Sequence, residues 1–286
     1  MAKSAIITGG ASGMGLAVAQ ALAARGGWDL HLVDLNAEAG KAAASSLPGA
    51  TFHQADATKY ASLAAAFEAA FKSSGRVDFV FANAGIAERD NFYMRHDTGS
   101  GPPPEPDMLV IKICLDAVVT TTYLAQHYFR QSPQDNQSLV MTASCGGIYP
   151  SAYSPMYSAA KHGVVGFMRC VATHFWHKDR IRVNAICPGT VRTNLLSQKE
   201  WQNFPAEYFT PVEKIVEAVL ILVDGKDDTP AEKTRIDGVE ADKKGVLWGE
   251  AVELSGANHY YRTKPKFSDS GMQAVMAATE MEEMQR

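Results

Sequence analysis

Short apolar runs alternate with longer stretches of helical periodicity, and this alternation constrains the fold more than any other feature. Seven strands are predicted, at 4–8, 29–34, 50–54, 77–82, 137–143, 181–187 and 250–254. Helices are predicted between them, at 14–25, 37–46, 60–74, 107–131, 155–178 and 211–223. Several of the strands lack polar alternation, which is typical of parallel strands buried on both faces. The order predicts an α/β fold, a doubly wound parallel sheet of about seven strands with helices on both faces.

Length and composition favour a single domain. The chain has 286 residues, of which 46% are apolar and 20% charged, and α/β folds often reach about 250 residues as one domain. We expect one domain over 1–256 and a tail over 257–286, in which 270–284 has the pattern of a short amphipathic helix. The segment 225–245 carries eleven charged side chains without strand or helix periodicity, so we expect an exposed excursion.

Charge and cysteine usage narrow the class of partner. The formal net charge of −4 argues against a nucleic-acid partner, because such proteins carry basic surfaces. Unbroken apolar stretches stay far below the roughly 20 residues of a membrane-spanning helix, so no membrane partner is expected. Because a strand is predicted already at 4–8, we expect no signal peptide. Four widely spaced cysteines without a C-x-x-C pair predict reduced thiols and a cytoplasmic protein.

A glycine-rich turn joins the first predicted strand to the first helix. In Thr8-Gly9-Gly10-Ala11-Ser12-Gly13-Met14-Gly15, the glycines allow a tight turn, close approach of backbone to a pyrophosphate, and packing of helix on strand. The helix N-terminus offers free N–H groups to phosphates. Asp34, nineteen residues after Gly15, ends the second strand, where a carboxylate binds ribose hydroxyls. The alternative is a purely structural turn.

Asp34 also discriminates between cofactors. A carboxylate at this position repels a 2′-phosphate, whereas NADP sites place a basic residue nearby. Neither Ala11-Ser12 nor Leu35-Asn36 is basic. The sequence therefore predicts NAD(H), unless Asp34 merely caps the following helix.

A tyrosine and a lysine share one face of the helix predicted at 155–178. The spacing of four places Tyr157 and Lys161 one turn apart, and Ser144 follows the strand at 137–143. Bringing a tyrosine from a pKa near 10 to neutrality requires about 4 kcal/mol. A positive charge about 4 Å away at an effective dielectric constant of about 20 supplies a similar amount. A neighbouring lysine could therefore make the tyrosine a usable general base. The alternative is that both side chains are exposed and have no chemical role.

These motifs together resemble the short-chain dehydrogenase/reductase family. Within it, Y-S-A-A-K-H-G-V-V-G-F at 157–167 and N-A-I-C-P-G at 184–189 look most like the hydroxyprostaglandin dehydrogenase-like branch and related fungal or insect alcohol dehydrogenases. The resemblance rests on T-G-G-A-S-G-M-G at 8–15, A-N-A-G at 82–85, Ser144, Y-S-A-A-K at 157–161 and P-G-T-V-R-T at 188–193. It implies a Rossmann-type fold and Ser144, Tyr157 and Lys161 as catalytic residues. It also implies a set of cofactor-binding residues, to which we add Ala57, just before the third predicted helix. The set is Gly9, Ser12, Gly13, Met14, Gly15, Asp34, Asp56, Asn83, Gly85, Tyr157, Lys161, Pro188, Gly189, Thr190, Val191 and Thr193.

The chain departs from the family pattern in two places. The usual Asp-Gly-Gly turn after the last strand is missing, since Val252-Glu253-Leu254-Ser255-Gly256 ends that strand and a tail follows. The second departure concerns a catalytic residue. Many members carry a catalytic Asn in the helix before the serine strand, where it holds a water that links the lysine to solvent. Here the matching stretch is Ile111-Lys112-Ile113-Cys114-Leu115-Asp116, so Cys114 takes that place. The resemblance therefore leaves the proton route open.

Aromatic residues lie where the family places its substrate loop. The segment 194–210 contains Trp201 and other aromatic side chains, and we expect it to act as a lid that excludes water. Tyr149 and Tyr153 are further substrate-contacting candidates. Ordinary subdomain packing is the alternative. No metal site is expected, because His174 and His177 have no nearby acidic or cysteine partner.

The sequence thus predicts an NAD(H)-dependent oxidoreductase that transfers hydride between nicotinamide and a hydrophobic or aromatic ketone or secondary alcohol. Tyr157 is expected to move the proton. A small-molecule substrate and a homodimer or homotetramer are the partners implied by the resemblance. The alternatives are a non-redox cyclase, dehydratase or epimerase on the same scaffold, and a non-catalytic cofactor-binding protein.

Overall fold

The computed structural model describes residues 2–97, 99, 101–133, 136–202, 204–229, 234–236, 239–240 and 245–279. Its strands are β1 (Lys3–Thr8), β2 (Trp28–Asp34), β3 (Ala50–Gln54), β4 (Phe79–Ala82), β5 (Ser138–Thr142), β6 (Arg182–Pro188), β7 (Thr234–Ile236), β8 (Val239–Glu240), β9 (Ala251–Ser255) and β10 (Asn258–Arg262). Its α-helices are α1 (Gly13–Arg25), α2 (Ala37–Ser45), α3 (Tyr60–Ser74), α4 (Leu109–Ile111), α5 (Ala117–Gln131), α6 (Pro155–Asp179), α7 (Gln198–Trp201), α8 (Val212–Asp224) and α9 (Ser270–Ala277).

All described strands join one sheet with the order β3-β2-β1-β4-β5-β6-β9-β10-β7-β8. The pairs from β3 to β9 are parallel, which confirms the predicted parallel sheet of about seven strands. The chain reverses its winding direction between β1 and β4, and ligands bind at such a switch point in open α/β sheets. The fold thereby directs attention to the carboxyl ends of β1, β4 and β5.

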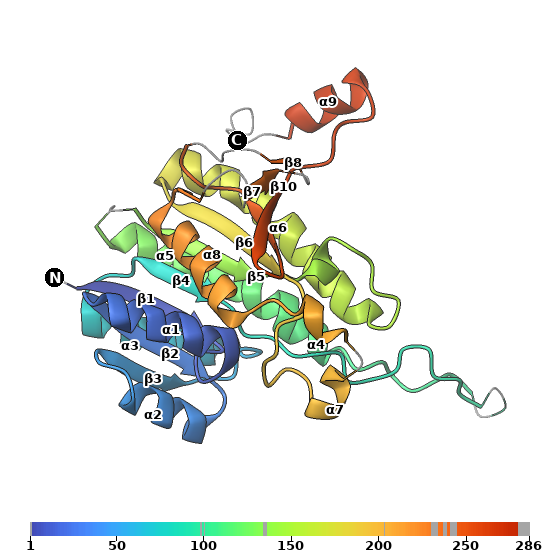
Figure 1. The fold of residues 1–286 in the computed structure, drawn as a ribbon, viewed down its shortest axis with the longest axis horizontal. Coiled ribbons are helices and arrows are strands. Elements are labelled where there is room, and N and C mark those ends of the chain that lie inside the picture. The colour runs from blue at the N-terminus through green and yellow to red at the C-terminus, as the bar shows by residue number, and fades with distance from the viewer. Residues whose placement is uncertain are drawn as a thin grey trace.

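Helices cover both faces of the sheet (Figure 1). One apolar core joins the sheet to α3, α5 and α6, and a second joins its other face to α1, α2 and α8. Successive residues of a strand serve opposite cores, as the pleat requires: Leu139 and Met141 of β5 belong to the first core, and Val140 to the second. Burial on both faces explains why these strands are continuous apolar runs.

The helix predicted at 107–131 is divided by a π-helical turn at Lys112–Asp116 between α4 and α5. By length and composition alone, Leu109–Gln131 is also apolar enough to cross a membrane. Here α5 packs on α3, α6 and the sheet, and its Val118, Leu124 and Phe129 belong to the core. The apolar composition is thus that of a core helix.

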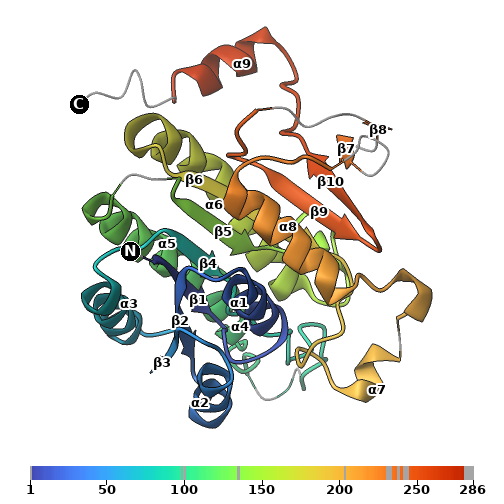
Figure 2. The same cartoon turned by 60° about the vertical axis from the view of Figure 1, so that its left-hand side comes forward.

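The sheet continues beyond residue 256, where the sequence predicts the end of the domain. β10 pairs antiparallel with β9, so residues 258–262 are part of the sheet rather than of a tail (Figure 2). The predicted irregular excursion 225–245 contains β7 and β8. Strands of two and three residues carry too few side chains to give a periodic pattern. Within the predicted tail helix, α9 covers 270–277, and 280–284 lies outside the described residues.

A buried polar network attaches the start of this excursion to β10. Asp227 accepts hydrogen bonds from His259 Nε2 and from the Tyr261 hydroxyl, both at 2.8 Å. The other ring nitrogen of His259 lies 2.9 Å from the ammonium of Lys214 in α8. Burial alone raises the pKa of Asp227, but the hydrogen bonds from His259, Thr229 and Tyr261 outweigh it and hold the pKa well below its ordinary value. The network fixes β10 under α8.

Candidate active site

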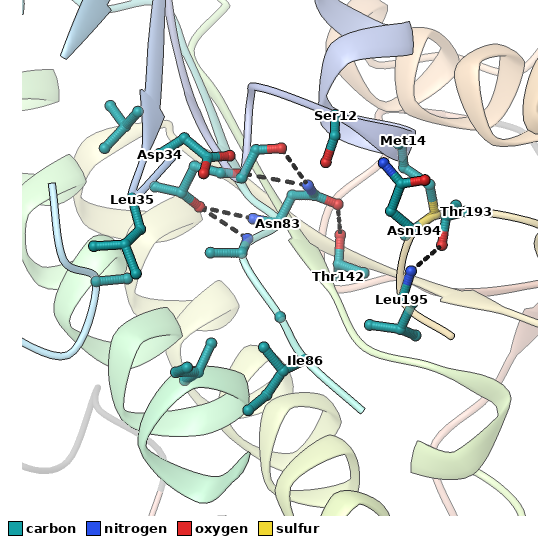
Figure 3. Close-up of a pocket in the computed structure, with 18 of the residues that line it drawn as sticks. Ser12, Met14, Asp34, Leu35, Asn83, Ile86, Thr142, Thr193, Asn194 and Leu195 are labelled. Carbon is teal, nitrogen blue, oxygen red and sulfur yellow. Dashed lines mark hydrogen bonds between the residues drawn. The ribbon is translucent and has the colours of Figure 1, made fainter. Parts of the chain in front are cut away.

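A cavity of about 300 Å³ opens at the carboxyl ends of β1, β4 and β5. Asp34 and Leu35 lie on one side of it, Thr193, Asn194 and Leu195 on the other, and Asn83 between them (Figure 3). The cavity brings together most of the sequence-predicted cofactor residues: Gly9, Ser12, Gly13, Met14, Asp34, Asp56, Ala57, Asn83, Gly85, Tyr157, Lys161 and Thr193.

The glycine turn between β1 and α1 forms one wall because its backbone needs conformations that favour glycine. Gly9 and Gly13 have φ angles of 65° and 53°, in the left-handed region. A Cβ on Gly15 would lie 2.3 Å from the Gly9 carbonyl oxygen, so Gly15 serves the close packing of helix on turn and does not line the cavity. The first N–H groups of α1 have no partner within the helix, and the Ser12 side chain makes no capping bond to them. This end of α1 is therefore open to an anion.

Two carboxylates stand at the carboxyl ends of the neighbouring strands. Asp34 accepts the N–H of Ala11 in the glycine turn at 3.1 Å and the N–H of Asn36 at 3.0 Å. Asp56 accepts both the N–H and the hydroxyl of Thr58, at 2.9 and 2.7 Å, and these bonds lower its pKa. Both carboxylates are thus held in place at the rim of the cavity.

A chain of hydrogen bonds crosses the floor of the cavity from β1 to α6. Thr8 Oγ1 accepts the N–H groups of Asn83 and Ala84 at 2.9 and 3.1 Å. The Asn83 amide oxygen accepts the Thr142 hydroxyl at 3.0 Å, as Figure 3 shows. The Thr142 carbonyl in turn accepts the Lys161 ammonium at 2.7 Å. Three strand ends and the buried ammonium are therefore fixed relative to one another.

Tyr157, Ser144 and Lys161 meet at one end of the cavity. Ser144 acts on the Tyr157 phenol and lowers its pKa, and Ser144 Oγ accepts the N–H of Gly146 at 3.1 Å. The Lys161 ammonium is 2% exposed and lies 5.5 Å from the centre of the Tyr157 ring. The predicted catalytic residues thus form one cluster, although Ser144 is not among the residues that line this cavity.

Burial dominates the acidity of Tyr157. It raises the pKa of the phenol, whereas the ammonium of Lys161 and the hydrogen bond from Ser144 lower it without fully compensating. With these two groups alone, the phenol remains an acid at neutral pH.

Cys114 lies in the π-helical turn and is fully buried. Its Sγ accepts the N–H of Ile86 at 3.4 Å, and its thiol donates to the Ile86 carbonyl at 3.3 Å. The thiol therefore links the π-helical turn to the segment that follows Gly85.

The remaining predicted cofactor residues do not line this cavity. Pro188 pairs with Leu254 in the sheet, and the N–H of Gly189 donates to the Leu254 carbonyl at 2.8 Å. Thr190 accepts the N–H of Thr210 through its carbonyl at 2.8 Å. Val191 is 6% exposed and belongs to the second core.

The three predicted substrate residues lie outside this cavity. The Tyr149 hydroxyl donates to the Glu253 carboxylate, and Tyr153 is 95% exposed. The Trp201 indole donates to the Thr193 carbonyl at 3.0 Å and lines an adjoining cavity of about 530 Å³.

Sequence reasoning missed Thr8 and Thr142 as the residues that connect the strand ends. Both end parallel strands, and that position is the only signal that could have identified them. It also missed Glu88, whose carboxylate accepts the N–H of Tyr157 at 2.8 Å.

The sequence profile described as short chain dehydrogenase matches residues 3–203. The chain belongs to the short-chain dehydrogenase/reductase family. A relative named short-chain dehydrogenase/reductase prx7, from Penicillium rubens, is 52% identical over 94% of this chain and 97% of its own. Human 15-hydroxyprostaglandin dehydrogenase (NAD+) is 32% identical over 72% of this chain and 74% of its own.

Solved structures of this family have the same fold. Levodione reductase has a TM-score of 0.65 and 30% identity, over 77% of this chain and 90% of that one. The 3-ketoacyl-(acyl-carrier-protein) reductase from Brucella melitensis complexed with NADH has a TM-score of 0.66 and 26% identity over the same shares. This short-chain dehydrogenase/reductase is therefore an oxidoreductase that transfers hydride between a nicotinamide cofactor and a small molecule. The matches do not favour the non-redox and non-catalytic alternatives.

The cavity fits a nicotinamide dinucleotide. The glycine turn leaves backbone uncovered at the open N-terminus of α1. Asp34 ends the neighbouring strand β2, at the position where such folds bind a ribose. At the opposite end lie Lys161 and Tyr157.

Proposed function

We propose that the enzyme uses NAD(H) to interconvert a ketone and a secondary alcohol, with Tyr157 as general acid and base. One observation carries the proposal: Ser144 and the buried ammonium of Lys161 both act on the Tyr157 phenol, in a cavity that is also lined by a glycine turn and Asp34. Ser144 orients the substrate oxygen. Lys161 holds the ribose and favours the ionised phenol.

The choice of NAD follows from charge. The Asp34 carboxylate is fixed by two backbone N–H groups. Within the described part of the chain, Lys161 is the only cationic residue on the cavity wall, and it lies at the Tyr157 end. A 2′-phosphate at Asp34 meets a negative charge without a compensating cation, and such like-charge contacts cost several kcal/mol. We expect NADH to exceed NADPH in kcat/KM by about 100-fold, and Asp34→Ser to reduce that ratio.

When bound, the nicotinamide supplies or accepts the hydride, and its oxidised ring carries a positive charge. The residues of the chain handle the proton. In the reductive direction, a phenol whose pKa is raised by burial is protonated at neutral pH and delivers its proton to the forming alkoxide. In the oxidative direction the phenol must first ionise, and the Lys161 ammonium, 5.5 Å from the ring centre, assists this by lowering the pKa of the phenol.

Apolar side chains beside the cavity support a hydrophobic substrate. Leu195, on the cavity wall, is 40% exposed. Phe204 and Tyr208, in the same predicted lid at 194–210, are 41% and 70% exposed. Trp201 packs on Phe204 and anchors the segment through Thr193. Water exclusion by such a segment suits hydride transfer to an apolar ketone.

The decisive test follows the absorbance of NADH at 340 nm with a panel of ketones and alcohols of graded size and polarity. Turnover of apolar ketones that is lost in Tyr157→Phe, with the dissociation constant of NADH unchanged, supports the proposal. Unchanged turnover in that variant refutes the role of Tyr157. Turnover of small polar carbonyls alone refutes the substrate class.

Assembly and location complete the proposal. Tyr123 and Val119 on α5 are 66% and 38% exposed, which supports a homodimer or homotetramer formed through this helix. The four cysteines are free thiols, which supports a cytoplasmic enzyme. Light scattering of the purified enzyme, with Tyr123→Glu as a variant, tests the assembly.

A further inference from the structure

A side chain from a distant segment holds the first turn of α6, the helix that carries Tyr157. Because α6 begins at Pro155, the N–H of Tyr157 is one of the first four, which have no partner within a helix. Ser154 precedes the helix, at the position where a serine usually caps it, but its side chain makes no capping bond. Instead, Glu88 Oε2 accepts the N–H of Tyr157 at 2.8 Å.

Glu88 stands on backbone that is itself fixed to the cofactor cavity. It follows Gly85, which lines that cavity, by three residues. Ile86, between them, is held through both its N–H and its carbonyl by the Cys114 thiol. The bond from Glu88 to Tyr157 therefore joins the start of α6 to a segment whose distance from the cavity is already set.

The burial of the Glu88 carboxylate indicates that this contact is a specific interaction. Glu88 Oε1 is buried and has no hydrogen-bond partner among the described residues. Burying a carboxylate is costly, and the positive end of α6 offsets part of that cost. Glu88 also lines a small cavity of about 20 Å³ together with Met156 and Val110.

We propose that Glu88 is a positioning residue for the Tyr157 phenol, acting through its hydrogen bond to the Tyr157 backbone. The proposal rests on the proposed function of Tyr157 as acid and base. Because a displacement of about 1 Å at a reacting group can cost about 100-fold in rate, loss of this bond is expected to lower kcat by 10- to 100-fold. The effect is expected to depend on the acceptor rather than on its charge, because the bond fixes the backbone N–H of Tyr157.

The experiment compares Glu88→Ala, which removes the acceptor, with Glu88→Gln, which keeps an acceptor without the charge. Asp269→Ala is the matched control, because Asp269 caps α9 through the N–H of Met272 at 2.7 Å, remote from the cavity. For each full-length variant, kcat, KM and the pH profile are measured on the best ketone of the panel. The dissociation constant of NADH is measured by fluorescence. Hydrogen exchange by mass spectrometry reports the amide of Tyr157.

We expect Glu88→Ala to lose at least tenfold in kcat, with the NADH dissociation constant within twofold and faster exchange at Tyr157. Glu88→Gln is expected to restore kcat to within threefold of the original enzyme with the same pH profile, and Asp269→Ala to change neither quantity. The proposal is overturned if Glu88→Ala keeps kcat and slow exchange, or if Glu88→Gln is as impaired as Glu88→Ala. If no ketone is turned over at all, the proposed function fails, and hydrogen exchange alone decides whether Glu88 holds Tyr157: unchanged exchange in Glu88→Ala overturns the contact.

Discussion

From a pair of neighbouring, partly buried histidines we predict that the protein loses stability in mild acid. His31 in β2 is 2% exposed, and its Nδ1 lies 3.0 Å from His53 Nε2 in β3. Its Nε2 lies 2.9 Å from the Ser74 hydroxyl. Burial, and to a smaller extent the neighbouring His53, lower the pKa of His31 from 6.5 to about 4. Burial also lowers the pKa of His53.

The sign and size follow from proton linkage. Between pH 6.5 and 4 the unfolded chain binds a proton at His31 that the folded chain does not, so the free energy of unfolding falls as the pH is lowered through this window. Above pH 6.5 the histidine is neutral in both states, so it does not change the free energy of unfolding. The difference of about 2.5 pKa units corresponds to about 3 kcal/mol, because one unit equals about 1.4 kcal/mol. His53 adds to the loss in the same direction.

Urea unfolding at several pH values between 7.5 and 4 measures this loss directly. In His31→Gln, which cannot titrate, we expect the decrease over that range to shrink by about 3 kcal/mol. His96→Gln is the control, because His96 is exposed, and it should leave the decrease unchanged. A His31→Gln variant with the same pH dependence as the original protein would refute the reasoning.

Three further perturbations test other parts of the structure. Arg182→Met removes a guanidinium that donates to the Leu222 and Val223 carbonyls at the end of α8. Urea unfolding should show a loss of about 2–4 kcal/mol, and a loss below about 1 kcal/mol contradicts this. Cys114→Ala removes both hydrogen bonds to Ile86, so kcat should fall about tenfold. The kcat of Cys114→Ser should stay closer to that of the original enzyme, and equal rates for the two variants argue against the thiol bonds. Burial raises the pKa of Tyr157, so the ionised fraction of the phenol grows as the pH rises from 6 to 9, and kcat/KM for alcohol oxidation should rise with it. A flat pH profile of kcat/KM, measured with saturating cofactor, contradicts a tyrosine base.

The sequence predicts the sheet and the cluster of Ser144, Tyr157 and Lys161 because each depends on a local pattern. Strands buried on both faces are continuous apolar runs, and a spacing of four places two side chains on one helix face. The motifs at the strand ends therefore converge once the parallel order is known.

Features that depend on contacts between distant segments escape such patterns. The bond from Glu88 to Tyr157 spans 69 residues. Nothing near Tyr149 in the sequence indicates that its hydroxyl turns to Glu253. The π-helical turn around Cys114 lies within a pattern that suits an ordinary helix. β10 follows β9 after a short turn at Gly256, and no local pattern distinguishes its five residues from the predicted tail.

The position of β10 has a consequence for shortened versions of this protein. β9 exchanges backbone hydrogen bonds with β6 on one side and β10 on the other. A chain cut after Gly256 would leave the outer N–H and carbonyl groups of β9 bare, and bare strand edges recruit other molecules into aggregates. Affinity tags are therefore better placed beyond Arg262 than at residue 256, where the sequence predicts the end of the domain. Precipitation of a truncated preparation would then reflect the bare edge of β9 rather than damage to the catalytic centre.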